Sequence, residues 1–267
     1  MGNKGVFFGG ILVVGAAAVI GVRYLHLPAP APTANLPVPA GESSAPAGAG
    51  AAALPAPPVD LQHSDAFMRG QAKNLSSNPG LTDWLKIDDI IRRLTAAAAV
   101  VAEGKSPRDS LKFLRPKKKF SVKKKGGQPF MDPRSYSRYD LVGDVFQSLN
   151  AQAVAGLLKQ LDPLFQAANN ELGNPNPDFH ATLLRAIQEV LRAPVVERDI
   201  PLREKVISYA FLPTADMDLE GLSAAQKHLL RMGPKNTAKI QDKLKEIARA
   251  MGVAGDQLPQ AQVYLAH

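Results

Sequence analysis

An uncharged stretch near the N-terminus constrains this chain more than any other feature. The 18 residues from Gly5 to Val22 are all Gly, Ala, Val, Ile, Leu or Phe. A helix needs roughly 17–25 apolar residues to cross the hydrocarbon core of a bilayer, so the run predicts a transmembrane anchor over residues 5–23 after a cytoplasmic stub at residues 1–4. A cleaved signal peptide is the alternative, although prolines crowd the small residues at 29–31 where cleavage would occur.

The distribution of basic residues predicts which side of the membrane the rest of the chain occupies. After Arg23 the next basic residue is Arg69, and loops poor in Lys and Arg are usually the ones translocated. The sequence therefore predicts a single-pass protein whose C-terminal part lies outside the cytoplasm. Gly5 and Gly9 have the spacing that lets two helices approach closely, so a homodimer through the anchor is a further hypothesis.

A spacer rich in proline and alanine follows the apolar run. In residues 28–58, 20 of 31 positions are Pro or Ala. Proline fixes the backbone and alanine buries little area, so such a stretch cannot offset the entropy lost on ordering. We predict a disordered linker over residues 24–80, then a folded domain over residues 81–251 and a C-terminal tail over residues 252–267. The linker would either extend the reach of the domain or be passive.

The pattern of the predicted domain is mainly helical. Apolar residues recur at three- and four-residue spacing over most of it, for instance across residues 84–101. Apolar and polar residues alternate before Gly126-Gly127, which predicts a small β-hairpin. Residues 195–212 fit either a strand or a short helix. The fold class we expect is mainly α, a helix-rich single domain with a small β-hairpin, after the transmembrane helix and the linker.

The net charge of the chain is concentrated in one short stretch. Lys and Arg number 32 and Asp and Glu 24, which gives +8, and residues 112–125 carry eight basic residues without an acid. The rest of the chain therefore balances at zero. We take these eight residues as candidates for binding a polyanion: Lys112, Arg115, Lys117, Lys118, Lys119, Lys123, Lys124 and Lys125.

Two interpretations of this cationic stretch remain open. In the first, the lysines are a solvated edge that protects the hairpin against pairing with other strands. In the second, they bind a polyanion, such as anionic lipid head groups or a cell-wall polymer, with ~1 kcal/mol from each basic residue near an anionic surface. Nucleic acid is not expected, because the predicted orientation places the domain outside the cytoplasm and the stretch has too few aromatic residues to stack bases.

The sequence offers few candidate residues for catalysis or metal binding. The chain has no cysteine, which excludes disulfides, thiolate catalysis and Cys-ligated zinc, and its five histidines have no partner at metal-ligand spacing. We therefore expect no cofactor, no metal and no enzymatic activity, with an envelope hydrolase as a third hypothesis. One compact group is a candidate recognition surface for a peptide or glycan, or else a structural corner at a helix start: Tyr136, Arg138, Tyr139 and Asp140.

Several motifs, in order along the chain, resemble those of a known family. They are Trp84–Leu85, Asp88–Arg93, Asp132–Asp140, Leu161–Phe165, Glu171–Gly173 and Gln226–Asn236. Over residues 81–250 the chain resembles the bacterial family of unknown function DUF3014. The resemblance implies a bacterial protein that carries an N-terminal hydrophobic segment and has no assigned activity.

These observations lead to one expected function and one alternative. We expect a membrane-anchored, extracytoplasmic interaction or scaffold protein of the bacterial cell envelope, single-pass in the inner membrane with its C-terminal domain in the periplasm. Its partners would be the membrane, through the N-terminal helix, and an envelope protein or an anionic polymer. The alternative is a polyanion-binding module that uses the lysine-rich hairpin at residues 112–125.

Overall fold

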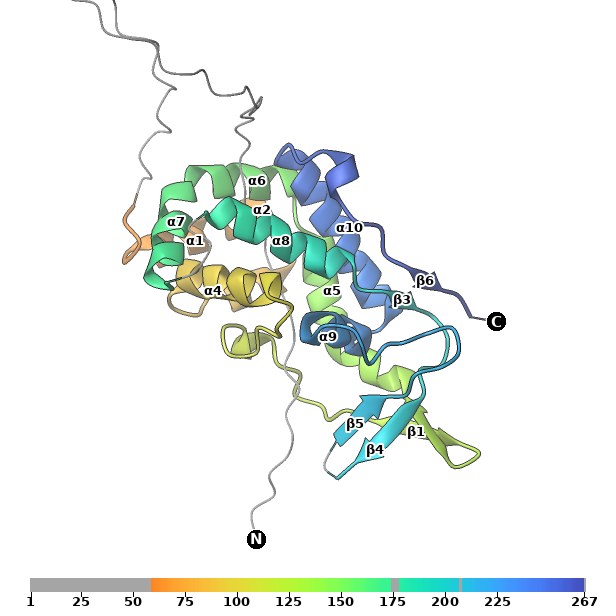
Figure 1. The fold of residues 1–267 in the computed structure, drawn as a ribbon. Coiled ribbons are helices and arrows are strands. Elements are labelled where there is room, and N and C mark those ends of the chain that lie inside the picture. Colours follow the sequence, from red (N-terminus) through yellow and green to blue (C-terminus); the bar gives the residue numbers. More distant parts are fainter. Residues whose placement is uncertain (1–58, 174–177, 207, 267) are drawn as a thin grey trace, which may run out of the picture.

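The structure, a computed structural model, describes residues 59–173, 178–206 and 208–266 (Figure 1). The predicted stub, the predicted anchor at residues 5–23 and the linker as far as residue 58 lie outside the described residues. Within the part that is described, no helix combines the length and the apolar character needed to span a bilayer.

Helices make up most of the described chain, as the apolar periodicity predicts. The described residues form ten α-helices: α1 (Ser64–Gly70), α2 (Ala72–Leu75), α3 (Pro79–Trp84), α4 (Ile90–Ala102), α5 (Asp140–Gln147), α6 (Ala151–Gln160), α7 (Asp162–Glu171), α8 (Phe179–Leu191), α9 (Ala224–Met232) and α10 (Pro234–Ala250). They also form three short 3-10 helices: η1 (Lys112–Leu114), η2 (Pro133–Tyr139) and η3 (Gly255–Gln257). Their six short strands are β1 (Val122–Lys125), β2 (Gln128–Met131), β3 (Val195–Val196), β4 (Leu202–Lys205), β5 (Ser208–Phe211) and β6 (Val263–Tyr264). The expectation of a helix-rich domain with small β elements is confirmed.

The helical body is built around α4, α8 and α10. The α8 helix packs against α4 and α10, while α10 also packs against α5 and α6. The apolar face of α8 is fully buried at Leu183, Ile187 and Leu191, which recur every four residues. Burial of each such side chain stabilises the fold by roughly 1.5–3 kcal/mol before entropy is counted. Figure 1 shows the β1, β4 and β5 strands together at one end of this body, with α9 near them.

Two β-hairpins share a second, smaller core. The strands β1 and β2 pair antiparallel around Gly126 and Gly127, both at positive φ, which confirms the predicted hairpin. The strands β4 and β5 form another antiparallel hairpin, so the open question over residues 195–212 is answered in favour of strands. The buried residues of this core are Met131, Val196, Ile200, Leu202, Phe211, Met217, Leu219 and Leu230.

The folded domain already includes residues 59–80, so the predicted linker is wrong over that range. The helices α1 and α2 bury Met68, Ala72 and Leu75 against the main core. Helices of four to seven residues carry too few apolar positions for a periodic signal, which is why the sequence did not predict them. Their stability comes from packing of α1 on α4 and of α2 on α6, contacts that are remote in the sequence.

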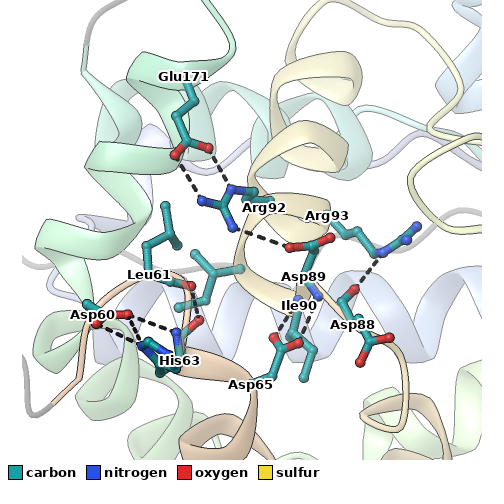
Figure 2. Close-up of polar contacts among 12 residues, drawn as sticks. Asp60, Leu61, His63, Asp65, Asp88, Asp89, Ile90, Arg92, Arg93 and Glu171 are labelled. Atoms are coloured by element: carbon teal, nitrogen blue, oxygen red, sulfur yellow. Dashed lines mark hydrogen bonds and ion pairs between the residues drawn. The ribbon is translucent and has the colours of Figure 1, made fainter.

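Hydrogen bonds connect α1 to the start of α4 (Figure 2). Asp89 has a left-handed backbone, with φ at 57°, and its own side chain does not cap α4. The Asp65 carboxylate from α1 accepts hydrogen bonds from the backbone N–H of Asp89 at 2.8 Å and of Ile90 at 2.9 Å. It therefore caps α4 and places a negative charge at the positive end of the helix dipole. Farther along α4, Arg92 donates to both carboxylate oxygens of Glu171 in α7.

The predicted C-terminal tail is also partly structured. The strand β6 pairs in parallel with β3, with Val195 opposite Val263 and Val196 opposite Tyr264. Leu258 is buried in the main core. The chain therefore belongs to the folded domain as far as Tyr264.

Candidate functional site

The structure divides the predicted cationic stretch into two parts with different surroundings. One is the lysine hairpin, β1–β2, which carries Lys123, Lys124 and Lys125. The other is the basic segment, residues 112–119, which begins with η1 and leads toward the hairpin. The candidate residues of the basic segment are Lys112, Arg115, Lys117, Lys118 and Lys119.

The lysines of the hairpin are paired with acids from a distant part of the chain. Lys123 and Lys125 both contact the carboxylate of Asp199, and the Lys124 ammonium lies 3.2 Å from a Glu204 carboxylate oxygen. Hydrogen bonds from Lys123 and Lys125 hold the pKa of Asp199 below its usual range. The three lysines thus orient the hairpin against β4 and the loop before it, and their charge is largely offset within the domain.

The lysines of the basic segment have a different environment. Lys112 lies 3.5 Å from Asp109, with both side chains exposed to solvent, so this pair contributes little. Lys117, Lys118 and Lys119 are exposed, and none of them contacts a carboxylate in the ranges that the structure describes. The surplus positive charge predicted for the hairpin is therefore displayed mainly by the segment before it.

The four residues of the predicted recognition surface lie where η2 passes into α5. Tyr139 is fully buried, so the prediction of a surface is wrong for this residue. Asp140 accepts a hydrogen bond from Asn236 Nδ2 at 3.0 Å. Tyr136 packs so closely against Gly233 that a Cβ there would lie 2.3 Å from the tyrosine Cγ. These contacts tie η2 to the turn between α9 and α10, and they favour the alternative of a structural corner.

The inner side of this corner meets α9 in a cluster of cations and rings. The Arg138 guanidinium lies over the rings of Phe120 at 5.4 Å and of Tyr139 at 5.2 Å. The Tyr139 ring packs edge-on to His228 of α9, with centroids 6.2 Å apart. Two further arginines act electrostatically on the same histidine. We call this group the arginine cluster, and it comprises Arg108, Arg138, Tyr139, His228 and Arg231.

Burial and like charge determine protonation in the arginine cluster. Burial lowers the pKa of His228 to about 3, and the positive charges of the three arginines add to the effect. His228 is therefore neutral near pH 7. Burial likewise lowers the pKa of Arg231 to about 10, and the other two arginines contribute to that shift. The pKa of the Tyr139 hydroxyl is raised, again chiefly by burial, so this group keeps its proton.

Three polar atoms of the cluster are buried without a hydrogen-bond partner among the described residues. They are Arg138 Nη2, Tyr139 OH and His228 Nε2. The other ring nitrogen of His228 lies 2.9 Å from Ser106 Oγ, and when it accepts the serine proton, Nε2 carries a hydrogen and all three atoms are donors. A buried polar group without a partner costs about 1–3 kcal/mol. The arginine cluster is therefore suited to a negatively charged hydrogen-bond acceptor.

A local signal positions the α9 side of the cluster. Ser223 and Gln226 form a capping box, in which each side chain satisfies the other residue's backbone N–H at the start of α9. His228 and Arg231 then lie three residues apart and share one face of the helix.

Sequence analysis did not select His228, Arg231 or Arg108 as part of a site. Two of the motifs that carry the family resemblance, residues 132–140 and 226–236, meet in the cluster. Both motifs are rich in polar and basic residues, which could have marked each of them as part of a site but could not show that they meet.

A separate apolar pocket lies between α1, α3, α4 and η1. Its cavity volume is about 50 Å³, and all its lining side chains are apolar, among them Met68, Trp84 and Phe113. Trp84 and Phe113 meet edge to face, with ring centroids 6.5 Å apart. The wall of this pocket contains no titratable group, so it offers hydrophobic surface without acid–base chemistry. In the described ranges, no group of three or more His, Asp or Glu residues is placed to hold a metal ion.

Comparison with known proteins identifies a family for this chain. The family described as "Protein of unknown function (DUF3014)" matches residues 90–248, which is more than half of the chain. No curated protein and no solved structure matches this chain. The matched region contains the basic segment, the lysine hairpin and the arginine cluster, whereas α1, α2 and α3 precede it.

Proposed function

The chain belongs to the DUF3014 family, and we propose that it is a membrane-anchored, extracytoplasmic interaction or scaffold protein of the bacterial cell envelope. Three parts in succession support this proposal: an apolar run suited to a bilayer, a spacer rich in Pro and Ala, and a folded domain. In this arrangement the domain would work in the periplasm, tethered to the inner membrane. A spacer of 31 residues extended at ~3.1 Å each would let it reach about 95 Å.

The basic segment is the observation that carries this proposal. Lys117, Lys118 and Lys119 are consecutive and exposed, and they have no carboxylate partner in the described part of the chain. Like charges side by side repel one another, so the fold gains nothing from this placement, whereas an acidic partner surface would complement it. We assign this surface to an acidic face of an envelope protein.

A polyanion is the second candidate ligand of the same surface. Lysine is a compact point charge on a flexible stem, so a run of lysines can follow a diffuse anionic surface that offers no shaped pocket. Anionic lipid head groups and cell-wall polymers both provide such a surface. The lysine hairpin contributes less to this function than the sequence predicts, because Asp199 and Glu204 already offset its charge.

Crosslinking in cells tests the scaffold proposal. A photo-crosslinking amino acid in place of Lys118 in the full chain should capture a defined envelope protein. Capture should be lost when Lys117→Ser and Lys119→Ser are added, because the acidic partner would no longer be attracted. Lys73→Ser with Lys159→Ser removes the same charge from exposed sites elsewhere and should leave capture unchanged. If no product depends on the charge of the basic segment, the scaffold proposal is wrong.

Elution from immobilised polyphosphate tests the second candidate. The full chain in neutral detergent is eluted with a salt gradient, and the triple change of Lys117, Lys118 and Lys119 to Ser should move elution to lower salt because fewer counterions are released on binding. A matched variant removes three exposed lysines at separate sites: Lys73→Ser, Lys159→Ser and Lys205→Ser. The polyanion candidate is rejected if both triple variants elute at the same salt concentration.

A further inference from the structure

We propose that the arginine cluster binds an oxyanionic group, a phosphate or a carboxylate, through Arg138 Nη2, Tyr139 OH and His228 Nε2. This site is separate from the basic segment and does not depend on the envelope function proposed above. It rests on the geometry of the described residues where η2 meets α9.

Three unpartnered hydrogen-bond donors from two elements belong to side chains of the cluster that contact one another. Arg138 and Tyr139 are adjacent on η2, with the guanidinium 5.2 Å from the tyrosine ring, and that ring packs edge-on to His228 of α9. Tyr139 and His228 are 0% and 4% exposed, and the unpartnered atom of each of the three residues is shielded from solvent. Donors on side chains in mutual contact suit the several oxygens of one anionic group, and hydrogen bonds to an ionised acceptor are the strong ones.

The electrostatic environment of these donors is strongly positive. The three arginines of the cluster all lie close enough to His228 to lower its pKa. Glu220 is an acid that acts on Arg231, but its carboxylate also lies 3.5 Å from the Lys227 ammonium and accepts a backbone hydrogen bond. A bound oxyanion would complement the positive charges of the three arginines that act on His228.

The stability of the fold does not explain this arrangement. Buried cations and unpartnered donors cost free energy, and apolar side chains of similar volume would fill the same space more favourably. A neighbouring side chain shows the contrast, because Asn236 Nδ2 donates to Tyr136 O, Asp140 Oδ1 and Met232 O at 3.0–3.1 Å. Asn236 Nδ2, at the same corner, is thus satisfied within the domain, while Arg138 Nη2, Tyr139 OH and His228 Nε2 have no acceptor in the described part.

Arginine side chains of the cluster reach the protein surface. Arg108 is exposed, and Arg138 and Arg231 are half-buried, so the buried donors lie behind side chains that reach the surface. Phe120, whose ring contacts the Arg138 guanidinium, directly follows Lys119. The basic segment therefore leads from solvent to the cluster, and its charge would raise the local concentration of an anionic ligand.

Thermal unfolding of the full chain in neutral detergent tests this proposal. Inorganic phosphate and acetate are titrated separately at fixed ionic strength, with chloride as the reference anion. We expect a saturable rise in melting temperature, because a ligand that binds only the folded state stabilises it. A larger response to phosphate assigns a phosphate-bearing ligand, and a larger response to acetate assigns a carboxylate. If neither anion stabilises the protein more than chloride does, the proposal is overturned.

The substitution Tyr139→Phe separates binding from folding, because it removes one unpartnered hydroxyl and keeps the ring. Without the anion, the variant should be at least as stable as the parent protein. Its Kd for the stabilising anion should rise roughly ten-fold, as expected for the loss of one hydrogen bond to a charged group. Tyr136→Phe is the matched control, since Tyr136 lies at the same corner but its hydroxyl is in the electrostatic field of the carboxylates of Asp199 and Asp132, which disfavours an anion there. An unchanged Kd in Tyr139→Phe would refute the proposed site.

Discussion

Acid should destabilise this domain through one buried histidine. His228 is 4% exposed, and burial together with three nearby arginines lowers its pKa from the usual 6.5 to about 3. The unfolded chain takes up the proton near pH 6.5 and the folded chain near pH 3, so the unfolded state binds more protons between these values. The contribution of His228 to the free energy of unfolding is therefore fully present above pH 6.5 and is lost as the pH is lowered toward 3.

The size of the effect follows from the two pKa values. Between pH 7 and pH 5 the histidine becomes almost fully protonated in the unfolded chain and stays neutral in the folded one. The free energy of unfolding should therefore fall by about 2 kcal/mol over this interval. Carboxyls with lowered pKa, such as that of Asp199, lose their contribution at lower pH and add little here. His180 acts in the opposite direction, because its hydrogen bond to Asp162 raises its pKa and stabilises the fold on the acid side.

Urea unfolding at pH 7, 6 and 5, with His228→Gln as the perturbation, measures this contribution. Glutamine stays neutral and can still bond to Ser106, so the comparison rests on the pH slope even if the variant is less stable at every pH. The parent protein should lose about 2 kcal/mol more than the variant between pH 7 and pH 5. His180→Gln is the control, and it should enlarge the acid loss. Equal losses in the parent and in His228→Gln would refute the assignment of a low pKa to the buried histidine.

Three further changes test the contacts that build the domain and offset its charge. Asp65→Asn should lower the free energy of unfolding in urea by about 1–2 kcal/mol, because the charged cap of α4 is lost. The control is Asp60→Asn, an exposed residue that does not cap α4, and it should change the free energy of unfolding by less than ~0.5 kcal/mol. Gly233→Ala should cost about 2–4 kcal/mol in the same assay, since φ at this position is 84° and a Cβ would lie 2.3 Å from Tyr136 Cγ; a neutral result would mean that η2 shifts freely. Asp199→Asn should free two lysines of the hairpin and raise the salt concentration that elutes the full chain from immobilised polyphosphate; unchanged elution would contradict the idea that this acid offsets their charge.

Sequence patterns over a few neighbouring residues predicted the helices and strands that depend only on such patterns. The alternation before Gly126-Gly127 predicted β1–β2, and the periodicity of residues 84–101 predicted the helix that the structure places at α4. The sequence did not predict α1, because its helical state depends on the packing of Met68 into the main core and on the bonds of Asp65 to the start of α4. Composition near the linker therefore underestimated the extent of the domain.

Only one part of the arginine cluster was predicted from the sequence, because the other part is joined to it by contacts between distant segments. Sequence analysis grouped Tyr139 with Arg138 and Asp140, and the structure places these residues where η2 passes into α5, but alternation of polar and aromatic residues could not show that Tyr139 is buried. His228 and Arg231 come from a distant part of the chain, and only the fold brings them to η2. Pairing across such a distance leaves no trace in local spacing.

Counting charges located the surplus of basic residues but not its surroundings. Asp199 and Glu204 hold the lysine hairpin against the β4 region, so the hairpin acts as a structural piece of the domain and the exposed surplus lies in the basic segment. That segment belongs to a stretch fixed at both ends on the arginine cluster: Ser106 contacts His228, and Phe120 contacts Arg138. The basic segment therefore lies within a loop, residues 106–120, whose first and last residues contact the cluster. An anionic partner would meet the exposed lysines of this loop, and the buried hydrogen-bond donors lie beside the residues at which the loop begins and ends.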